Sequence, residues 1–255
     1  MTAPRLVTLI TGASSGLGAE FARQCAVRGE ELVLVARRRD RLDELAASLP
    51  TRAHVFPLDL AQGEAAVSLV EAVEAEGLAI DTLINNAGFG LAGKVAKLPL
   101  ERQREMIDLN VRTLTELCRL VLPAMLERGQ GGILNVASTA AFQPGPNMAV
   151  YYASKAYVLS FTEALHHELR GTPIRVSCLC PGPTESEFAD VAGSHSPALE
   201  RIKRPADSVV RAGLAGLDKN KAVVVPGLPN KVTSQVSRFL PRATMRRIVG
   251  AVKVD

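Results

Sequence analysis

The sequence lacks the features of membrane, secreted and zinc-binding proteins. Its 255 residues contain no apolar run of the ~18–20 residues that a membrane-spanning helix needs. The opening MTAPRLVTLI has no charged region or cleavage site typical of a signal peptide, because a strand-like apolar run begins almost at once. The cysteines have the spacing of neither a disulfide framework nor a metal site; they are Cys25, Cys118, Cys178 and Cys180. We therefore expect a reduced, cytoplasmic protein without a metal.

An excess of charge of one sign is also missing. Lysine and arginine total 30 against 26 aspartate and glutamate residues, which gives a formal net charge of +4. The basic residues gather locally, at Arg37–Arg41 and in the C-terminal tail. Such clusters favour an anionic small molecule as the partner over a nucleic acid.

No linker, repeat or low-complexity segment divides the chain, so we expect a single domain with a large core. Apolar runs alternate with amphipathic stretches, a pattern typical of a doubly wound α/β fold, with a parallel sheet between two layers of helices. The predicted strands are residues 6–11, 31–36, 53–58, 81–85, 132–138, 174–179 and 222–225. The predicted helices are 16–28, 39–48, 62–76, 99–128, 149–170 and 206–217. Ligands of such folds bind at the C-terminal ends of the strands.

The stretch LVTLITGASSGLG, residues 6–18, predicts a phosphate-binding turn between a buried strand and a helix. Glycine at 12 permits a sharp reversal, at 16 leaves room for a pyrophosphate, and at 18 allows tight packing of the helix on the strand. The serine hydroxyls and helix N–H groups can donate to phosphates. An ordinary glycine-rich turn is the alternative. The predicted contacts are Gly12, Ser14, Ser15, Gly16, Leu17 and Gly18.

The end of the second predicted strand favours NADP(H) over NAD(H). An acidic side chain about 20 residues after the glycines binds the ribose hydroxyls in NAD proteins, but Ala36 stands there, followed by Arg37 and Arg38. A guanidinium can bind a 2′-phosphate, and the missing carboxylate removes a repulsion. The arginines also lie at a helix N-terminus, where cations are unfavourable without a nearby anion. A solvated helix start is the alternative.

Three further sites follow from the next segments. Asp59, before Leu60 at the end of a strand, can accept a hydrogen bond from an adenine amino group or cap the next helix. The run of amides and glycine at Asn85–Gly88 suits a backbone that passes close to a cofactor ribose. Asn110 lies among apolar positions of a predicted helix, which favours a buried polar site or a satisfied core residue.

A possible acid/base centre follows the fifth predicted strand. Ser138 ends that strand, and Tyr151 and Lys155 are four residues apart on the next helix, so they project from one face. A phenol has a reference pKa of about 10, and a nearby ammonium and the helix N-terminus are expected to lower the pKa of Tyr151. The three side chains would then place an acid/base beside a hydroxyl that orients a carbonyl.

Taken together, these motifs resemble the classical short-chain dehydrogenases/reductases over about residues 5–227. The matching residues are T11-G-A-S-S-G-L-G18, N85-N-A-G88, Asn110, Ser138, Y151-Y-A-S-K155 and P181-G182. Three sequence segments resemble those of a bacterial reductase group labelled DltE-like; they are LCPGPTESEF, NNAGFG and VARRRDRLDEL. The resemblance implies a Rossmann-type seven-stranded parallel sheet. It also implies hydride transfer between NAD(P)(H) and a carbonyl or alcohol.

The resemblance also implies roles for individual residues. Tyr151 would be the proton donor or acceptor, and Lys155 would lower its pKa and hold the nicotinamide ribose. Ser138 would polarise the carbonyl, and Asn110 would position a proton-relay water. The remaining implied cofactor contacts are Asn86, Ala87, Gly88, Pro181, Gly182, Thr184 and Ser186. Many relatives carry threonine where Ser186 stands, and the hydroxyl is kept.

The substrate is left open by the sequence. Residues 183–204 are expected to form a lid, with His195 as a weak candidate for substrate contact. Phe89, Phe142, Met148 and Phe188 could line an apolar pocket or belong to the core. An NADP(H)-dependent carbonyl reductase is the favoured function. The alternatives are a sensor that binds NADP(H) without turnover, and an NAD-dependent alcohol dehydrogenase of the same fold.

The tail beyond Gly227 carries two apolar stripes at helical spacing, flanked by arginines. We divide the chain into a catalytic part, residues 1–227, and an extension, residues 228–255. The extension is expected to dock on the domain or on a partner subunit of a homodimer or homotetramer. A helix on a membrane surface is the less favoured alternative.

Overall fold

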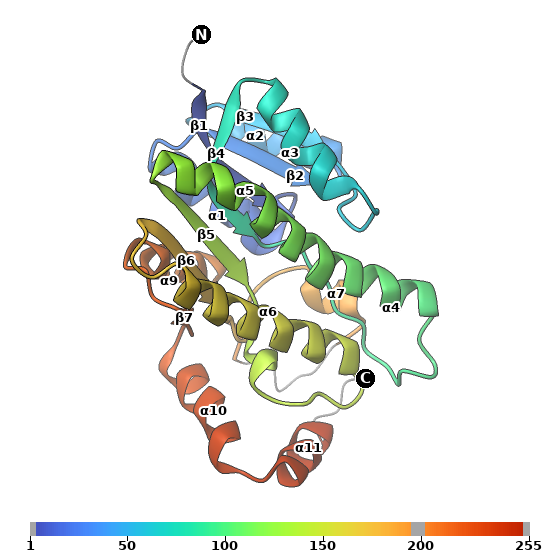
Figure 1. Cartoon of the computed structure of the whole chain (residues 1–255). Coiled ribbons are helices and arrows are strands. Elements are labelled where there is room, and N and C mark those ends of the chain that lie inside the picture. The colour runs from blue at the N-terminus through green and yellow to red at the C-terminus, as the bar shows by residue number, and fades with distance from the viewer. Residues whose placement is uncertain (1–3, 195–201, 252–255) are drawn as a thin grey trace.

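The computed structural model describes residues 4–194 and 202–251. His195, the weak substrate-contact candidate, lies outside the described residues. The described part forms one seven-stranded parallel sheet with the strand order β3-β2-β1-β4-β5-β6-β7, and helices cover both of its faces (Figure 1). This confirms the predicted fold class. The order reverses direction after β1, which places a ligand crevice beside the carboxyl ends of β1 and β4.

The strands are continuous apolar runs because both faces of the sheet are buried. In β2, Val33 and Val35 join one core while Leu32 and Leu34 join the other. This alternation follows from the two-residue period of a strand. The strands are β1 (Arg5–Thr11), β2 (Leu32–Ala36), β3 (Ala53–Pro57), β4 (Leu78–Asn85), β5 (Gly131–Val136), β6 (Ile174–Leu179) and β7 (Val223–Val224).

Each face of the sheet has its own set of helices and its own core. One core contains residues of α3 (Ala65–Ala75), α5 (Leu114–Arg128) and α6 (Ala149–Glu168). The other contains residues of α1 (Gly16–Val27), α2 (Arg39–Ser48) and α9 (Ala206–Asp218). The bounds of these helices lie within three residues of the predicted ones, except in the segment 99–128.

The segment 99–128 is not one continuous α-helix, as the sequence predicted. It consists of α4 (Leu100–Ile107), a π-helical turn η1 (Asp108–Thr113) and α5. Such π-turns are rare and occur often at functional sites. The apolar periodicity does not reveal the turn, because one inserted residue changes the register of the side chains only locally. Asn110 lies within it.

The C-terminal extension forms two helices, α10 (Leu228–Phe239) and α11 (Arg242–Ala251). They lie beyond the end of the sheet, with α11 near the loop that precedes α6 (Figure 1). A Cβ on Gly250 would lie 3.3 Å from Pro146 in that loop. Pro241 separates the two helices because its ring cannot continue α10. Among the described helices, none combines the length and the apolar character that a membrane crossing needs.

Candidate active site

A cleft of about 790 Å³ runs along the carboxyl ends of the strands. Most of the residues predicted to bind a cofactor or act in catalysis line it. They are Gly12, Ser14, Ser15, Gly16, Leu17, Arg37, Arg38, Asp59, Leu60, Asn86, Ala87, Gly88, Ser138, Tyr151, Lys155, Pro181, Gly182, Thr184 and Ser186. Gly18 and Asn110 do not line the cleft, and both support it from behind.

The glycine turn is shaped by close contacts and by left-handed backbone. Gly12 has φ +68° and Gly16 has φ +52°, a conformation that side chains with a Cβ rarely adopt. A Cβ on Gly18 would lie 2.1 Å from the carbonyl oxygen of Gly12, so only glycine lets α1 pack this closely on β1. No side chain caps the N-terminus of α1 at Ser15. The first N–H groups of α1 therefore remain suited to an anion.

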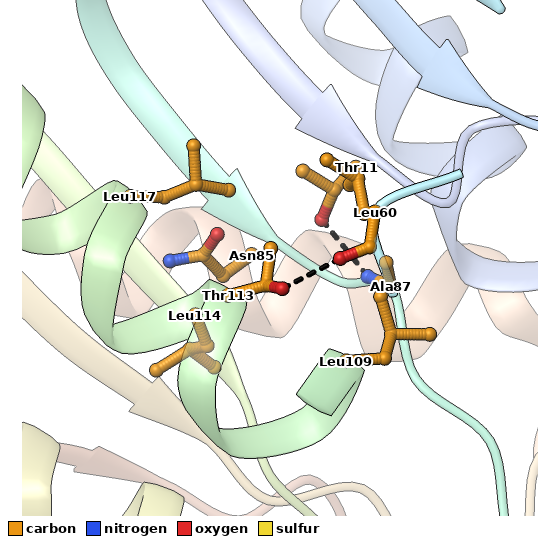
Figure 2. A pocket seen from close by; sticks show the side chains of 8 residues that line it. All are labelled: Thr11, Leu60, Asn85, Ala87, Leu109, Thr113, Leu114 and Leu117. Atoms are coloured by element: carbon orange, nitrogen blue, oxygen red, sulfur yellow. Dashed lines mark hydrogen bonds between the residues drawn. The ribbon is translucent and has the colours of Figure 1, made fainter. Parts of the chain in front are cut away.

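The loop after β4 is fastened to the end of β1, as Figure 2 shows around a small cavity of about 10 Å³. The hydroxyl oxygen of Thr11 accepts hydrogen bonds from the backbone N–H groups of Asn86 (3.0 Å) and Ala87 (2.9 Å). Thr113, from the π-turn, donates to the carbonyl oxygen of Leu60 at 2.6 Å. These bonds hold the backbone at the centre of the cleft in one conformation.

A cluster of opposite charges occupies the outer end of the cleft. Arg38 donates to the hydroxyl of Ser14 through Nε (3.2 Å) and Nη2 (3.1 Å). Its Nη1 pairs with Glu187 Oε2 at 3.0 Å, and Arg41 pairs with Glu187 Oε1 at 2.6 Å. The two guanidinium groups lower the pKa of Glu187, with the Arg41 hydrogen bond as the largest cause. Glu187 thus supplies the anion that arginines at the start of α2 require.

Asp59 serves the local backbone as well as lining the cleft. Its carboxylate accepts a hydrogen bond from the N–H of Ala61 at 3.1 Å. That contact is a turn within the loop after β3, because α3 begins only at Ala65. The sequence offered Asp59 as a cap of the following helix, but in the structure its carboxylate stabilises this loop instead.

Ser138, Tyr151 and Lys155 line the same cleft, and a hydrogen bond joins Tyr151 to Ser138. Ser138 is the N-cap of a short 3₁₀ helix, η2 (Thr139–Phe142), and its oxygen accepts a hydrogen bond from the N–H of Ala140. Tyr151 and Lys155, in the first turns of α6, are 8% and 5% exposed. The ammonium of Lys155 donates to the carbonyl oxygen of Val136 at 2.8 Å, which ties α6 to the end of β5.

The pKa of Tyr151 is raised, whereas the sequence predicted that it would be lowered. Burial raises it to about 12, and a hydrogen bond with Ser138 offsets part of this rise. The prediction that the pKa of Tyr151 is lowered is wrong, because burial disfavours the phenolate and is the largest effect on this group. Burial likewise lowers the pKa of Lys155 to about 8, against a weaker opposing effect of Cys178 and Cys180.

Asn110 supports the cleft from the π-turn. Its side-chain amide clamps the backbone of Phe89, accepting from the N–H at 3.2 Å and donating to the carbonyl oxygen at 3.0 Å. The same amide nitrogen donates to Ser154 on α6 at 3.0 Å. Asn110 is only 1% exposed, so it acts on the cleft through the loop and the helix that it joins.

The loop after β6 closes the cleft on the side of the C-terminal extension. The N–H of Thr139 donates to the carbonyl oxygen of Pro181 at 2.8 Å, and Arg204 and Pro183 are joined by a backbone bond of 3.0 Å. A Cβ on Gly182 would lie 2.4 Å from Nδ2 of Asn230 in α10. The extension is therefore seated directly on this loop.

Two groups of cleft residues were missed by the sequence reasoning. Glu187 was not recognised, although its position after Thr184 and Ser186 was a signal. The apolar residues of the extension were assigned to docking, yet several line the cleft: Val236, Leu240, Met245, Ile248 and Val249. Of the apolar pocket candidates, Phe89, Met148 and Phe188 line the cleft, whereas Phe142 packs against the core.

Comparison with known proteins gives one family. A family model described as short chain dehydrogenase matches residues 6–196. Sulfoacetaldehyde reductase 2 of Chromohalobacter salexigens is 40% identical over 203 residues, which cover 78% of this chain and 81% of the relative. The NADP-dependent 3-hydroxy acid dehydrogenase YdfG of Escherichia coli (strain K12) is 36% identical over 188 residues, 73% of this chain and 76% of the relative.

Solved structures agree over most of the chain. A 7beta-hydroxysteroid dehydrogenase has a TM-score of 0.87 at 26% identity, covering 97% of both chains. A short-chain dehydrogenase from Sphingobium yanoikuyae in complex with NADPH has a TM-score of 0.80 at 32% identity, covering 94% of this chain and 97% of the other. One from Burkholderia phymatum in complex with NAD has a TM-score of 0.81 at 27% identity, covering 92% and 93%.

The buried ammonium of Lys155 predicts a particular pH dependence of stability. Its pKa is lower in the folded protein, about 8 against 10.5 for a solvated lysine, so the unfolded chain binds more protons between these values. Stability therefore rises with pH across this window. We expect the unfolding free energy of the wild type, relative to Lys155→Met, to rise by about 1–3 kcal/mol from pH 8 to pH 10. Denaturant unfolding of both proteins measures this difference, and a constant difference would contradict it.

Proposed function

This chain belongs to the short-chain dehydrogenase family, and from that membership we propose that it is an NADP(H)-dependent carbonyl reductase, acting reversibly on the corresponding alcohols. Membership establishes an oxidoreductase. The observation that carries the finer proposal is the meeting of Ser138, Tyr151 and Lys155 in a cleft whose outer end holds Arg38. Oxidation of an alcohol by the same residues is the reverse of this reaction.

The residues of the cleft fit a dinucleotide. The free N–H groups of α1 and the glycine turn suit a pyrophosphate, and the glycines leave the backbone open to it. Arg38 and the hydroxyl of Ser14 lie together at the position where a 2′-phosphate would be bound, and Ala36 brings no carboxylate to repel it. Asn86, Gly88 and Lys155 would flank the nicotinamide ribose. When bound, the nicotinamide would supply a hydride to the carbonyl carbon in reduction, or accept one from the alcohol carbon in oxidation.

The protein groups handle the proton and the orientation. We propose that Ser138 donates a hydrogen bond to the carbonyl oxygen, which polarises the carbon. Tyr151 then donates its phenolic proton to the same oxygen. A pKa of about 12 keeps this phenol protonated near neutral pH, which suits the direction of reduction. Lys155, held against Val136, would orient the cofactor ribose.

The cofactor preference is proposed from this chain's own residues, because the solved structures of its relatives contain different cofactors. The Sphingobium yanoikuyae structure contains NADPH and the Burkholderia phymatum structure contains NAD. The related YdfG is named NADP-dependent. Arg38, Arg41 and the absence of an acidic residue at position 36 support NADP(H).

We expect Tyr151→Phe to reduce carbonyl turnover by at least 1,000-fold, because the only change is the loss of the proton donor. Oxidation of NADPH with a panel of ketones, aldehydes and 3-oxoacyl thioesters measures this, and cofactor binding is measured by NADPH fluorescence. Tyr157→Phe is the matched control, since Tyr157 is a phenol on the same helix that is 39% exposed and does not line the cleft. Turnover that survives in Tyr151→Phe would refute the acid/base role. Tight NADPH binding by the wild type without consumption of any carbonyl would favour the sensor.

A second prediction concerns the cofactor. We expect the wild type to prefer NADPH to NADH in kcat/KM, and Arg38→Ala to reduce this preference about 10- to 100-fold by removing a charged contact to the 2′-phosphate. Arg39→Ala is the control, because Arg39 lies next in sequence and pairs with Asp43 on the helix surface. Steady-state kinetics with both cofactors measure the ratio. A wild-type preference for NADH would overturn the assignment.

A further inference from the structure

The C-terminal extension contributes one wall of the catalytic cleft. Val236 and Leu240, from α10 and its end, line the same cavity as Tyr151, as do Met245, Ile248 and Val249 from α11. Met245 is 7% exposed, whereas Val236 and Ile248 are 40% and 51% exposed. Apolar side chains that face a cavity and remain exposed are stabilised when an apolar ligand covers them.

Apolar and aromatic side chains around Tyr151 line the same cavity. The ring of Tyr151 lies 5.1 Å from that of Phe188 and 6.0 Å from that of Tyr152, measured between centroids. Phe188 and Met148 both approach the backbone of Gly90, where a Cβ would lie 2.8 and 3.1 Å from them. Tyr151 therefore lines one cavity together with the aromatic ring of Phe188 and with aliphatic side chains of α10 and α11.

Among the described residues that line the cleft around Tyr151, the charged side chains are Glu105, Lys155 and Lys203, and none of them is directed at an anionic substrate by a contact that the structure shows. Glu105 lines the cavity and forms an ion pair with Arg102, whose guanidinium lies 4.8 Å from the ring centroid of Phe89. Lys155 donates to Val136 and is assigned to the cofactor ribose by the proposed function, and Lys203 has an interaction of its own. A sulfonate or carboxylate would need a cation directed at it.

Building on the proposed function, we infer that α10 and α11 form the outer wall of the substrate chamber, and that the substrate is a bulky, uncharged apolar ketone or the matching alcohol. A small or charged aldehyde would leave the aliphatic side chains of the extension uncovered. A large apolar body would cover the exposed side chains of Val236 and Ile248 while its carbonyl reached Tyr151 in the same cavity.

The first test compares substrates on the full-length wild type with NADPH. We expect kcat/KM to increase at least tenfold from cyclohexanone through decalone to a steroid ketone, since each ring adds apolar area to be buried. Sulfoacetaldehyde is the small anionic probe. Higher kcat/KM for sulfoacetaldehyde or cyclohexanone than for the steroid ketone would overturn the inference and leave the proposed function standing. Absence of turnover with every carbonyl would overturn the proposed function itself.

The second test uses a matched pair of variants in one helix. Val236 lines the cavity, whereas Val232, one turn earlier in α10, is 56% exposed and does not. We expect Val236→Asn to lower the ratio of kcat/KM for the steroid ketone to that for cyclohexanone about tenfold, while Val232→Asn leaves the ratio as in the wild type. Ile248→Asn in α11 repeats the test independently. Equal ratios in all three variants would show that the extension is not a substrate wall.

Glu187 carries a second inference, from a different observation. Its carboxylate binds the guanidinium groups of Arg38 and Arg41 at 3.0 and 2.6 Å, and Arg38 also holds Ser14. A 2′-phosphate bound at Arg38 would bring about two negative charges beside this carboxylate. Both anions need the same guanidinium donors, and they repel each other.

On the premise of NADP(H) use, we infer that Glu187 competes with the 2′-phosphate for Arg38 and Arg41, and so sets how strongly the protein distinguishes NADP(H) from NAD(H). The ion pairs are 40–46% exposed, which makes them weak and readily exchanged. Removal of the carboxylate charge is therefore expected to increase the affinity for the 2′-phosphate moderately, without changing the arrangement of the site.

Calorimetric titration with adenosine 2′,5′-bisphosphate and adenosine 5′-monophosphate tests this without any reaction. We expect Glu187→Gln to increase the preference for the bisphosphate about fivefold. Glu185→Gln is the matched control, because Glu185 is an exposed carboxylate of the same loop and leaves the preference unchanged. A lower or unaltered preference in Glu187→Gln would refute the competition. A wild type that does not distinguish the two ligands would refute NADP(H) use instead.

Discussion

The arrangement of the cleft depends on the junction between α6 and the end of β5. The ammonium of Lys155 donates to the carbonyl oxygen of Val136, and further along the helix Thr162 accepts from Asn135, which in turn accepts from Asn85. These buried bonds link α6, β5 and β4 in a polar network whose members are satisfied by one another. Because Tyr151 stands one turn before Lys155, the position of the phenol in the cleft follows from this junction.

Local sequence patterns were sufficient to predict most of the fold. Alternating apolar runs and helical stripes were sufficient for the seven strands and the layers, and the glycine spacing located the turn before α1. The family motifs added the residues that line the cleft. The π-turn at Asn110 and the wall formed by Val236 and Ile248 were not predictable, because they depend on contacts between distant segments. The pairing of Glu187 with Arg38, across 149 positions of the chain, also depends on such contacts, although the position of Glu187 after Thr184 and Ser186 was a signal. The homo-oligomer and the division at residue 227 stay predictions.

The direction of the pKa shift of Tyr151 does not follow from the spacing of the motif. The spacing of tyrosine and lysine on one helix face indicates proximity, and proximity to an ammonium favours the phenolate. Burial acts in the opposite direction on both groups, raising the pKa of Tyr151 and lowering that of Lys155. Sequence spacing does not report the depth of a side chain below the surface, so it cannot rank these two effects.

The contact between Gly182 and Asn230 joins two parts of the protein that would otherwise be independent. The backbone at Gly182 belongs to the loop at the cofactor half of the cleft, while Asn230 lies in the first turn of the helix that reaches the substrate half. Since no side chain fits between them, a shift of α10 has to be accommodated by that loop. Grafting a different C-terminal segment to alter substrate range would therefore perturb coenzyme affinity too. In directed evolution, these two properties are expected to change together.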